Sequence, residues 1–233
     1  MNGTFPPPPE FSDAAPAFFQ AHPLVLASSS PRRRDFMREL GLSFRILPAR
    51  TKEERPLPDE KAMAYALRTA RSKAGHVRRE LPLAADEPAP LVLAADTIVV
   101  LDGDILGKPA SPAEAVAMLE RLSGRTHNVI TACCLWFADE QEPRVEFADS
   151  TSVLFAPWPR EILEAYTATG DPMDKAGAYG IQGKGAFLVE RIEGSWSTVA
   201  GLPVSRVLHA LFACGALIFP QEPQASAPCP LQP

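Results

Sequence analysis

The sequence lacks any apolar run that approaches the roughly 20 residues needed to cross a bilayer. It also contains no Lys or Arg before Arg32, so its beginning lacks the basic region of a secretory signal. These two absences predict a cytoplasmic protein that does not act on or in a membrane.

An excess of positive charge is missing as well. The formal net charge is -5, whereas a protein that holds a nucleic acid polymer by its phosphates needs a basic face. A free nucleotide needs only a few local cations, so the charge does not exclude it. The four cysteines form no metal-type or redox-type pair, which predicts reduced thiols. They are Cys133, Cys134, Cys214 and Cys229.

Both ends of the chain are rich in proline. Residues 1–23 include Pro6–Pro9, and residues 220–233 read PQEPQASAPCPLQP. Such segments carry too little apolar surface to offset the entropy lost on ordering. We therefore expect two disordered tails around one folded domain, residues 24–219. With 46% hydrophobic residues in 233, the chain can build one full core or two lobes that share one.

Strand and helix patterns alternate within this domain, which predicts an α/β fold. Because both hairpins and crossovers occur, we expect a mixed sheet. The predicted strands are Leu24–Ala27, Phe44–Leu47, Leu91–Leu101, Thr126–Phe137, Val145–Phe155 and Ala186–Ile192. The predicted helices are Ser30–Gly41, Asp59–Glu80, Ser111–Gly124, Pro159–Thr169 and Pro203–Gly215. Asp102-Gly103 is typical of a hairpin turn.

The stretch from Ser28 to Arg33 places three hydroxyls and two cations where a strand ends and a helix begins. A helix N-terminus presents free N–H groups and favours anions. Serine hydroxyls and guanidinium groups add donors suited to phosphate oxygens. The pattern indicates a phosphate site, and the alternative is an ordinary capped helix with solvated arginines.

Carboxylates stand at two further places. Asp96, followed by Thr97, interrupts an otherwise apolar strand, where a buried carboxylate is costly unless it is paired or bound to a metal. Such a residue can hold Mg²⁺ or act as a base; the alternative is a structural Asp satisfied by backbone donors. Glu53-Glu54 lie in a charged loop and would complete an oxygen ligand set only if the fold brings them to Asp96.

Two lysines and one glycine-rich stretch complete the candidates. Lys73 lies at the edge of the apolar stripe of its helix, and Lys108 stands between Gly107 and Pro109. Each either extends into solvent or reaches a site. Residues 174–185 read DKAGAYGIQGKG, whose glycines indicate unusual backbone conformations or close approach to a ligand. The stretch lacks the spacing of a P-loop, and the alternative is a flexible loop.

Together these motifs resemble the Maf family. They are LASSSPRRRDFMRELGLSF, AADTIVVLDGDILGKP, LSGRTHNVITA, DKAGAYGIQGKGA and GLPVSRVLHAL. The resemblance spans about Leu24 to Leu211. It implies a mixed, twisted sheet in two lobes with a central cleft, similar to inosine triphosphate pyrophosphatases. It also implies cleavage of nucleoside triphosphates between the α and β phosphates, with a homodimer common in the family.

The resemblance also implies roles for individual residues. Asp96 matches the catalytic base, with Lys73 and Lys108 as catalytic cations and Glu53 and Asp96 as ligands of Mg²⁺ or Mn²⁺. The substrate-binding positions that it implies are Ser28, Arg32, Arg33, Thr97 and Gln182. Arg32, Arg33, Thr97 and Gln182 resemble the branch that acts on dTTP and UTP. A departure is Lys52-Glu53-Glu54, where many members have an Asp-Glu pair.

Three alternative functions stay open at this point. One alternative is a pyrophosphatase with the same reaction whose substrate is a purine triphosphate or 7-methyl-GTP. A phosphatase would release single phosphates instead of pyrophosphate. A nucleotide-sensing regulator of cell division would act by binding, although nothing in the sequence resembles a helix or groove that binds a partner protein.

Overall fold

The computed structural model describes residues 18–51 and 55–219. The two predicted tails lie largely outside this part, and Glu53 and Glu54 lie wholly outside it. Within the described ranges a seven-stranded sheet has the order β3-β2-β4-β6-β7-β8, with β5 paired to β4. Its strands are β2 Leu24–Leu26, β3 Phe44–Ile46, β4 Leu91–Leu101, β5 Asp104–Leu106, β6 Thr126–Phe137, β7 Val145–Phe155 and β8 Val189–Glu193.

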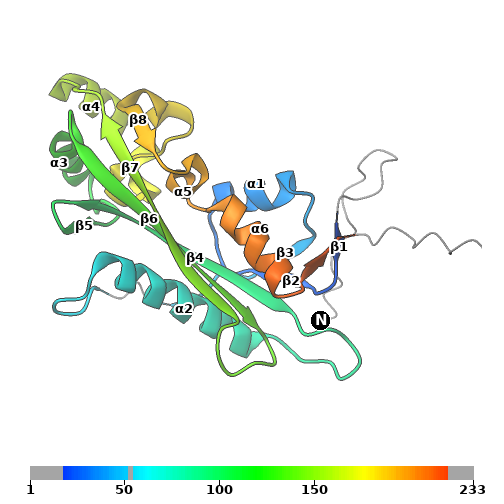
Figure 1. The fold of residues 1–233 in the computed structure, drawn as a ribbon. Helices are drawn as coiled ribbons and strands as arrows, with labels where there is room; N and C mark the ends of the chain where they lie inside the picture. Colours follow the sequence, from blue (N-terminus) through cyan, green and yellow to red (C-terminus); the bar gives the residue numbers. More distant parts are fainter. Residues whose placement is uncertain (1–17, 52–54, 220–233) are drawn as a thin grey trace, which may run out of the picture.

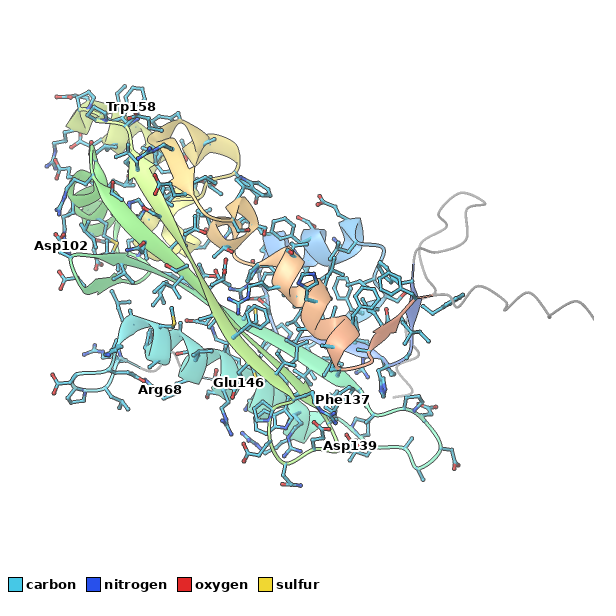
Figure 2. The ribbon with its side chains drawn as sticks, in the orientation of Figure 1. Arg68, Asp102, Phe137, Asp139, Glu146 and Trp158 are labelled. Atoms are coloured by element: carbon cyan, nitrogen blue, oxygen red, sulfur yellow. The ribbon has the colours of Figure 1, made fainter. Side chains whose placement is uncertain are left out.

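The sheet is mixed, as the sequence predicts. Strand β2 runs parallel to β3 and β4, whereas β4, β6, β7 and β8 pair antiparallel. The long hairpin β6–β7 spans the molecule, with Phe137 at one end and Trp158, just after β7, at the other (Figure 2). The helices are α1 Pro31–Glu39, α2 Ala62–Glu80, α3 Pro112–Leu122, α4 Arg160–Ala168, α5 Trp196–Ala200 and α6 Val204–Ala213.

The alternation of side chains along β4 divides the core. Even-numbered residues such as Val92 and Ala94 pack with α2 on one face. Odd-numbered residues face the other side, where Leu91, Leu93 and Ala95 join one cluster and Val99 joins another. The first cluster includes α1 and α6, and the second α3 and α4. Figure 1 shows α2 on one face and α1 and α6 on the opposite face. The two odd-face clusters are the two lobes.

The folded region begins before residue 24, contrary to the predicted boundary. Phe19–Gln20 forms β1, which pairs antiparallel with β9, Leu217–Ile218. The Phe18 ring lies 5.9 Å from that of Phe212, and His22 packs against Phe137. These aromatic residues supply the apolar surface that the preceding prolines lack, so residues 18–23 are ordered by contacts far away in the sequence.

Other element boundaries also differ from the prediction. Helix α2 begins at Ala62, because Asp59 has a φ of 59° and Glu60 accepts hydrogen bonds from Leu57 N and Arg68. Residues 183–188 form a 3-10 helix, so β8 begins at Val189 and not at Ala186. Helix α5 is absent from the prediction. The hairpin turn is confirmed, with φ angles of 53° and 91° at Asp102 and Gly103.

Helix N-termini agree with the sequence only in part. Ser111 Oγ accepts a hydrogen bond from Glu114 N, and Glu114 Oε2 accepts one from Ala110 N. This is the reciprocal arrangement that stabilises the start of a helix. Ser30 occupies the N-cap of α1 before Pro31, but its side chain makes no capping hydrogen bond. The start of α1 is therefore correctly predicted, although the Ser30 side chain does not cap the helix.

A buried histidine lies in the lobe formed by α3 and α4. His127 is 2% exposed, its Nε2 lies 2.8 Å from Tyr179 Oη, and its ring contacts Phe155 and Tyr179. Burial among these rings lowers the pKa of His127 to about 4, against about 6.5 in an unfolded chain. The folded protein therefore holds this imidazole neutral at pH values where the unfolded chain protonates it.

We expect the free energy of unfolding to fall as the pH is lowered from about 6.5 to about 4. In this window the unfolded chain binds more protons than the folded one, so stability rises with pH and is lost on acidification. His127→Gln should flatten this dependence in urea titrations at several pH values. The exposed His209 gives the control, because His209→Gln should leave the dependence unchanged. A slope that survives in His127→Gln contradicts the assignment.

Candidate functional site

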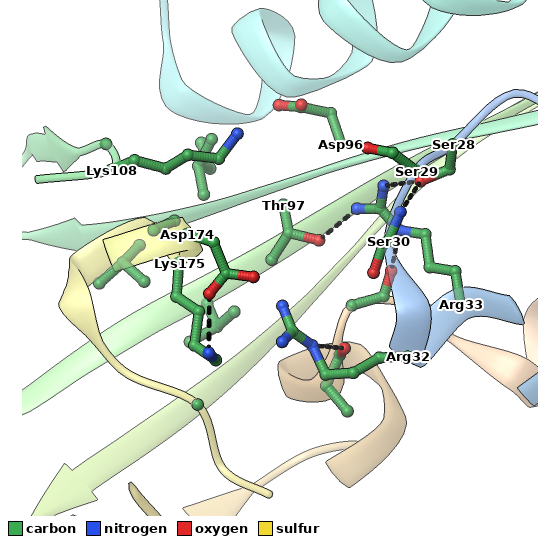
Figure 3. Close-up of a pocket in the computed structure, with 18 of the residues that line it drawn as sticks. Ser28, Ser29, Ser30, Arg32, Arg33, Asp96, Thr97, Lys108, Asp174 and Lys175 are labelled. Atoms are coloured by element: carbon green, nitrogen blue, oxygen red, sulfur yellow. Dashed lines mark hydrogen bonds and ion pairs between the residues drawn. The ribbon is translucent and has the colours of Figure 1, made fainter. Parts of the chain in front are cut away.

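A gap in the sheet beside β4 provides the site. Strand β2 pairs with Leu91–Leu93 and strand β5 with Val99–Leu101. Among the described residues, no strand pairs with residues 94–98 on that edge, although β6 pairs with them on the other. A cavity of about 300 Å³ lies at this gap (Figure 3), within the size range of small-molecule sites.

The turn from β2 into α1 forms one wall of the cavity. Ser28, Ser29, Ser30 and Arg32 line it at the N-terminus of the helix. Ser28 Oγ accepts a hydrogen bond from Ser30 N at 3.2 Å, which fixes the turn. Arg32 donates from Nε to Ala200 O, 3.3 Å away. The predicted phosphate site is thus an assembled wall of hydroxyls, a cation and a helix N-terminus.

Arg33 is directed into the protein. Its Nε donates to Gly201 O at 2.7 Å, and Nη1 donates to Ser28 Oγ and Ala95 O at 3.0 and 2.9 Å. Nη2 donates to Thr97 Oγ1 at 3.0 Å. Burial lowers the pKa of Arg33, and the attraction of Asp96 opposes this effect. Arg33 thus occupies part of the open edge of β4, and most of its donors are used before a substrate arrives.

The hydroxyl of Thr97 belongs to a directional chain. Thr131 Oγ1 donates to Thr198 O at 2.8 Å, so in its 2.9 Å contact with Thr97 Oγ1 it accepts. Thr97 therefore donates its only hydroxyl hydrogen to Thr131 and accepts from Arg33. Towards the cavity, which Thr97 lines, this oxygen can accept a hydrogen bond but cannot donate one.

Asp96 and Lys73 form an ion pair on the face of β4 that packs against α2, opposite to the face of Thr97. Lys73 reaches from α2, and its Nζ lies 2.5 Å from Asp96 Oδ1. The Asp96 side chain is 8% exposed and that of Lys73 24%, and both line the cavity. The ammonium offsets the cost of burying the carboxylate. Lys73 therefore points into the site, and the alternative of a solvated lysine is wrong.

The predicted residues that the structure describes are thus brought together with one exception, and Glu53 lies outside the described residues. Lys108 lines the cavity, next to Gly107, whose carbonyl accepts a hydrogen bond from Gly177 N at 3.0 Å. Gln182 is half-buried and is not among the described residues that line the cavity, although its neighbours Gly180 and Ile181 are. Its role in recognising the base stays a prediction.

Several lining residues were given no role of their own from the sequence, among them three polar ones. Asp174 and Lys175 stand at the start of the glycine-rich stretch, and Tyr65 lies on α2. The glycines were the available signal: a Cβ at Gly180 would lie 2.9 Å from Lys175 Cε, so the loop closes around this side chain. Nothing in the sequence marks Tyr65, which lies within an ordinary amphipathic helix.

Comparison with known proteins identifies the family. A family model described as Maf-like protein matches residues 23–214. The chain belongs to the Maf family. Among curated relatives, a dTTP/UTP pyrophosphatase of Oleidesulfovibrio alaskensis is 48% identical, covering 86% of this chain and 89% of that protein. A dTTP/UTP pyrophosphatase of Nitratidesulfovibrio vulgaris is 47% identical, covering 89% and 94% respectively.

Solved structures give a weaker similarity. A HAM1 protein from Coxiella burnetii matches with a TM-score of 0.48 and 16% identity, covering 82% of the Maf chain and 99% of that structure. A similarity of this size says nothing about activity. Across residues 18–51 and 55–219, no helix is long and apolar enough to cross a membrane.

The hydroxyl chain leads to a prediction about stability. Thr97→Val keeps the shape of the side chain but leaves a donor of the buried Arg33 without its partner. Losing such a partner costs about 1–3 kcal/mol, so we expect the free energy of unfolding to drop by this amount in urea titrations. Thr97→Ser retains the hydroxyl and is the matched control, which should lose clearly less. Equal losses in both variants would assign the effect to packing.

Proposed function

We propose that this Maf protein hydrolyses dTTP and UTP to the nucleoside monophosphate and pyrophosphate. One observation carries the proposal. The hydroxyls and cation at the start of α1, Lys73, Lys108 and the Asp96 carboxylate meet in one cavity. Such a cavity suits a polyphosphate that is to be attacked by water. The curated relatives, which are named dTTP/UTP pyrophosphatases, support the same substrates.

Asp96 is suited to the role of base. Its Oδ1 accepts from Lys73, which keeps the carboxylate oriented and leaves Oδ2 to accept a proton from water. The water oxygen then bonds to the α-phosphorus as the bond from that phosphorus to the bridging oxygen breaks. Arg32, Lys108 and the N–H groups at the start of α1 would stabilise the charge on the phosphate oxygens and on the leaving pyrophosphate.

A divalent cation belongs to the proposal as well. Among the described residues no group of three or more His, Cys, Asp or Glu side chains is arranged to hold a metal. Mg²⁺, however, commonly binds to one or two carboxylates together with substrate phosphates, and Asp96 supplies one carboxylate in the cavity. Asp96, with Glu53 as predicted from the sequence, would hold Mg²⁺ or Mn²⁺. The cation would neutralise charge on the polyphosphate.

The pyrimidine preference rests mainly on the relatives. The cavity is also lined by apolar residues that can contact a nucleoside, namely Val99, Ile105, Val129, Ile181 and Val199. Two further expectations are part of the same proposal: the cytoplasmic location predicted from the sequence, and the homodimer implied by the family resemblance.

Replacing the base should abolish turnover and spare binding. We expect Asp96→Asn to lose at least about a hundredfold in kcat, the scale of losing a general base, while dTTP still binds in calorimetric titrations. Asp35→Asn is the control, because Asp35 is exposed and pairs with Arg38 on the surface of α1. Turnover within a few-fold of the wild type in Asp96→Asn would remove Asp96 from this role.

The identity of the first phosphate product tests the reaction itself. With dTTP and Mg²⁺ or Mn²⁺, we expect one pyrophosphate per nucleoside monophosphate and no early orthophosphate. A panel of dTTP, UTP, GTP and 7-methyl-GTP should show the highest kcat/KM for the first two. Orthophosphate as the first product would indicate a phosphatase, and binding without turnover would indicate a nucleotide sensor.

A further inference from the structure

The loop of residues 171–181 forms one wall of the cavity and packs around a buried lysine, Lys175. Lys175 is 9% exposed. Its ammonium donates to the carbonyl oxygen of Asp171, to Asp171 Oδ1 at 3.2 Å and to Asp174 Oδ1 at 2.8 Å. These three acceptors use all three of its hydrogens. Lys175 therefore has no donor left for a phosphate.

The surrounding chain fixes this lysine in place. The stem of Lys175 passes so close to Gly180 that a Cβ there would lie 2.9 Å from Cε. Tyr166 Oη donates to Asp171 Oδ2 at 2.6 Å. A Cβ at Gly185 would lie 2.6 Å from the same Tyr166 Oη. Close packing at Gly180 and Gly185 and the hydrogen bond from Tyr166 thus fix the Lys175–Asp171 pair. The Lys175 ammonium in turn fixes Asp174 through its hydrogen bond to Oδ1.

Asp174 has the wrong charge for a phosphate ligand. Its side chain is 65% exposed, it lines the cavity, and Figure 3 shows it facing the space between Lys108 and Arg32. Lys175 occupies Oδ1, so Oδ2 is available to the cavity. A carboxylate repels phosphate oxygens. It also accepts hydrogen bonds and cannot donate them. Asp174 therefore suits a part of the substrate that carries a hydrogen-bond donor.

The chemistry of the substrate narrows that donor to two groups. At neutral pH dTTP offers only the 3′-hydroxyl of the sugar and the N3–H of the base as donors. The sugar connects the phosphates to the base. Asp174 faces the space between Lys108 and Arg32, two cations assigned to the phosphates, and the sugar hydroxyl is the donor that lies nearer to the phosphates. The position of Asp174 along the cavity therefore matches the sugar, and carboxylates are established acceptors of ribose hydroxyls in nucleotide sites.

We propose that Asp174 accepts a hydrogen bond from the 3′-hydroxyl of the substrate, and that Lys175 is the residue that positions it. The proposal rests on the proposed function, because it assumes a nucleoside triphosphate in this cavity. It makes Asp174 a determinant of specificity for the sugar, separate from the residues that act on the phosphates.

The test compares dTTP with 2′,3′-dideoxythymidine triphosphate, which lacks this hydroxyl. A hydrogen bond to a charged group corresponds to a preference of about 10- to 100-fold, so the wild type should favour dTTP by this factor in kcat/KM. Asp174→Ala should bring the ratio close to 1, with kcat/KM for the dideoxy substrate unchanged or higher. Asp35→Ala, which removes an exposed aspartate outside the cavity, should retain the wild-type ratio.

Lys175→Met keeps the stem and removes the ammonium. If Lys175 acts through Asp174, this variant should also lower the dTTP preference, and combining it with Asp174→Ala should lower the preference no further. A purely structural role would reduce kcat/KM for both substrates alike and leave the ratio intact. If Lys175→Met does not fold, Asp174→Ala still decides the proposal.

Several results would overturn the assignment. They are a wild-type ratio near 1, a ratio that persists in Asp174→Ala, and an equal loss for both substrates in that variant. A raised Mg²⁺ requirement with the ratio intact would make Asp174 a metal ligand instead. These outcomes differ from failure of the proposed function, in which the wild type would release no pyrophosphate from dTTP at all.

Discussion

The unpaired edge of β4 between β2 and β5 is the constraint on which the site depends. A strand buried in a sheet satisfies its N–H and C=O groups with two neighbours, and here one neighbour is missing over residues 94–98 in the described part of the chain. Unsatisfied backbone groups are costly away from water. Arg33 satisfies one of these backbone groups by donating a hydrogen bond to Ala95 O. The gap gives a substrate access to the middle of the sheet, where the surrounding strands hold every side chain in place.

Adjacent residues at this gap serve different partners because a strand alternates its side chains between two faces. Asp96 faces α2 and pairs with Lys73. Thr97 faces the opposite side, where it joins Arg33 and Thr131 at the junction of the two lobes. Apolar residues continue the strand on either side of this pair, in separate clusters. Thr97 therefore lies at the boundary where the hydrophobic cores of the two lobes meet, whereas Ala94 and Ile98, on either side of Asp96, belong to one cluster.

Much of this arrangement could be predicted from local patterns. Asp96 stood out because a carboxylate within an apolar strand needs a partner, and the helix start after Ser28 was visible from Pro31 and the hydroxyls. The rest depended on contacts between distant segments. Phe18 is ordered by Phe212, and the loop around Lys175 takes its shape from Gly180 and Gly185. Arg33 could not be distinguished from Arg32 in sequence. Both line the cavity, and only the fold shows that Arg33 makes four hydrogen bonds within the protein whereas Arg32 makes the one to Ala200 O.

The charges of the cavity are divided between the walls. Arg32 and the start of α1 belong to one lobe, Lys73 to α2 on the other face, and Lys108 and Asp174 to the loops of the second lobe. Arg33 and Lys175 donate their hydrogen bonds mainly to groups of the protein. They therefore hold the walls of the cavity in place, and other residues contact the substrate. Among the lining residues that the structure describes, no single wall carries both the cations for a triphosphate and an acceptor for a sugar. A substrate satisfies all of them only by spanning the gap, so its length from base to terminal phosphate becomes part of what the fold recognises.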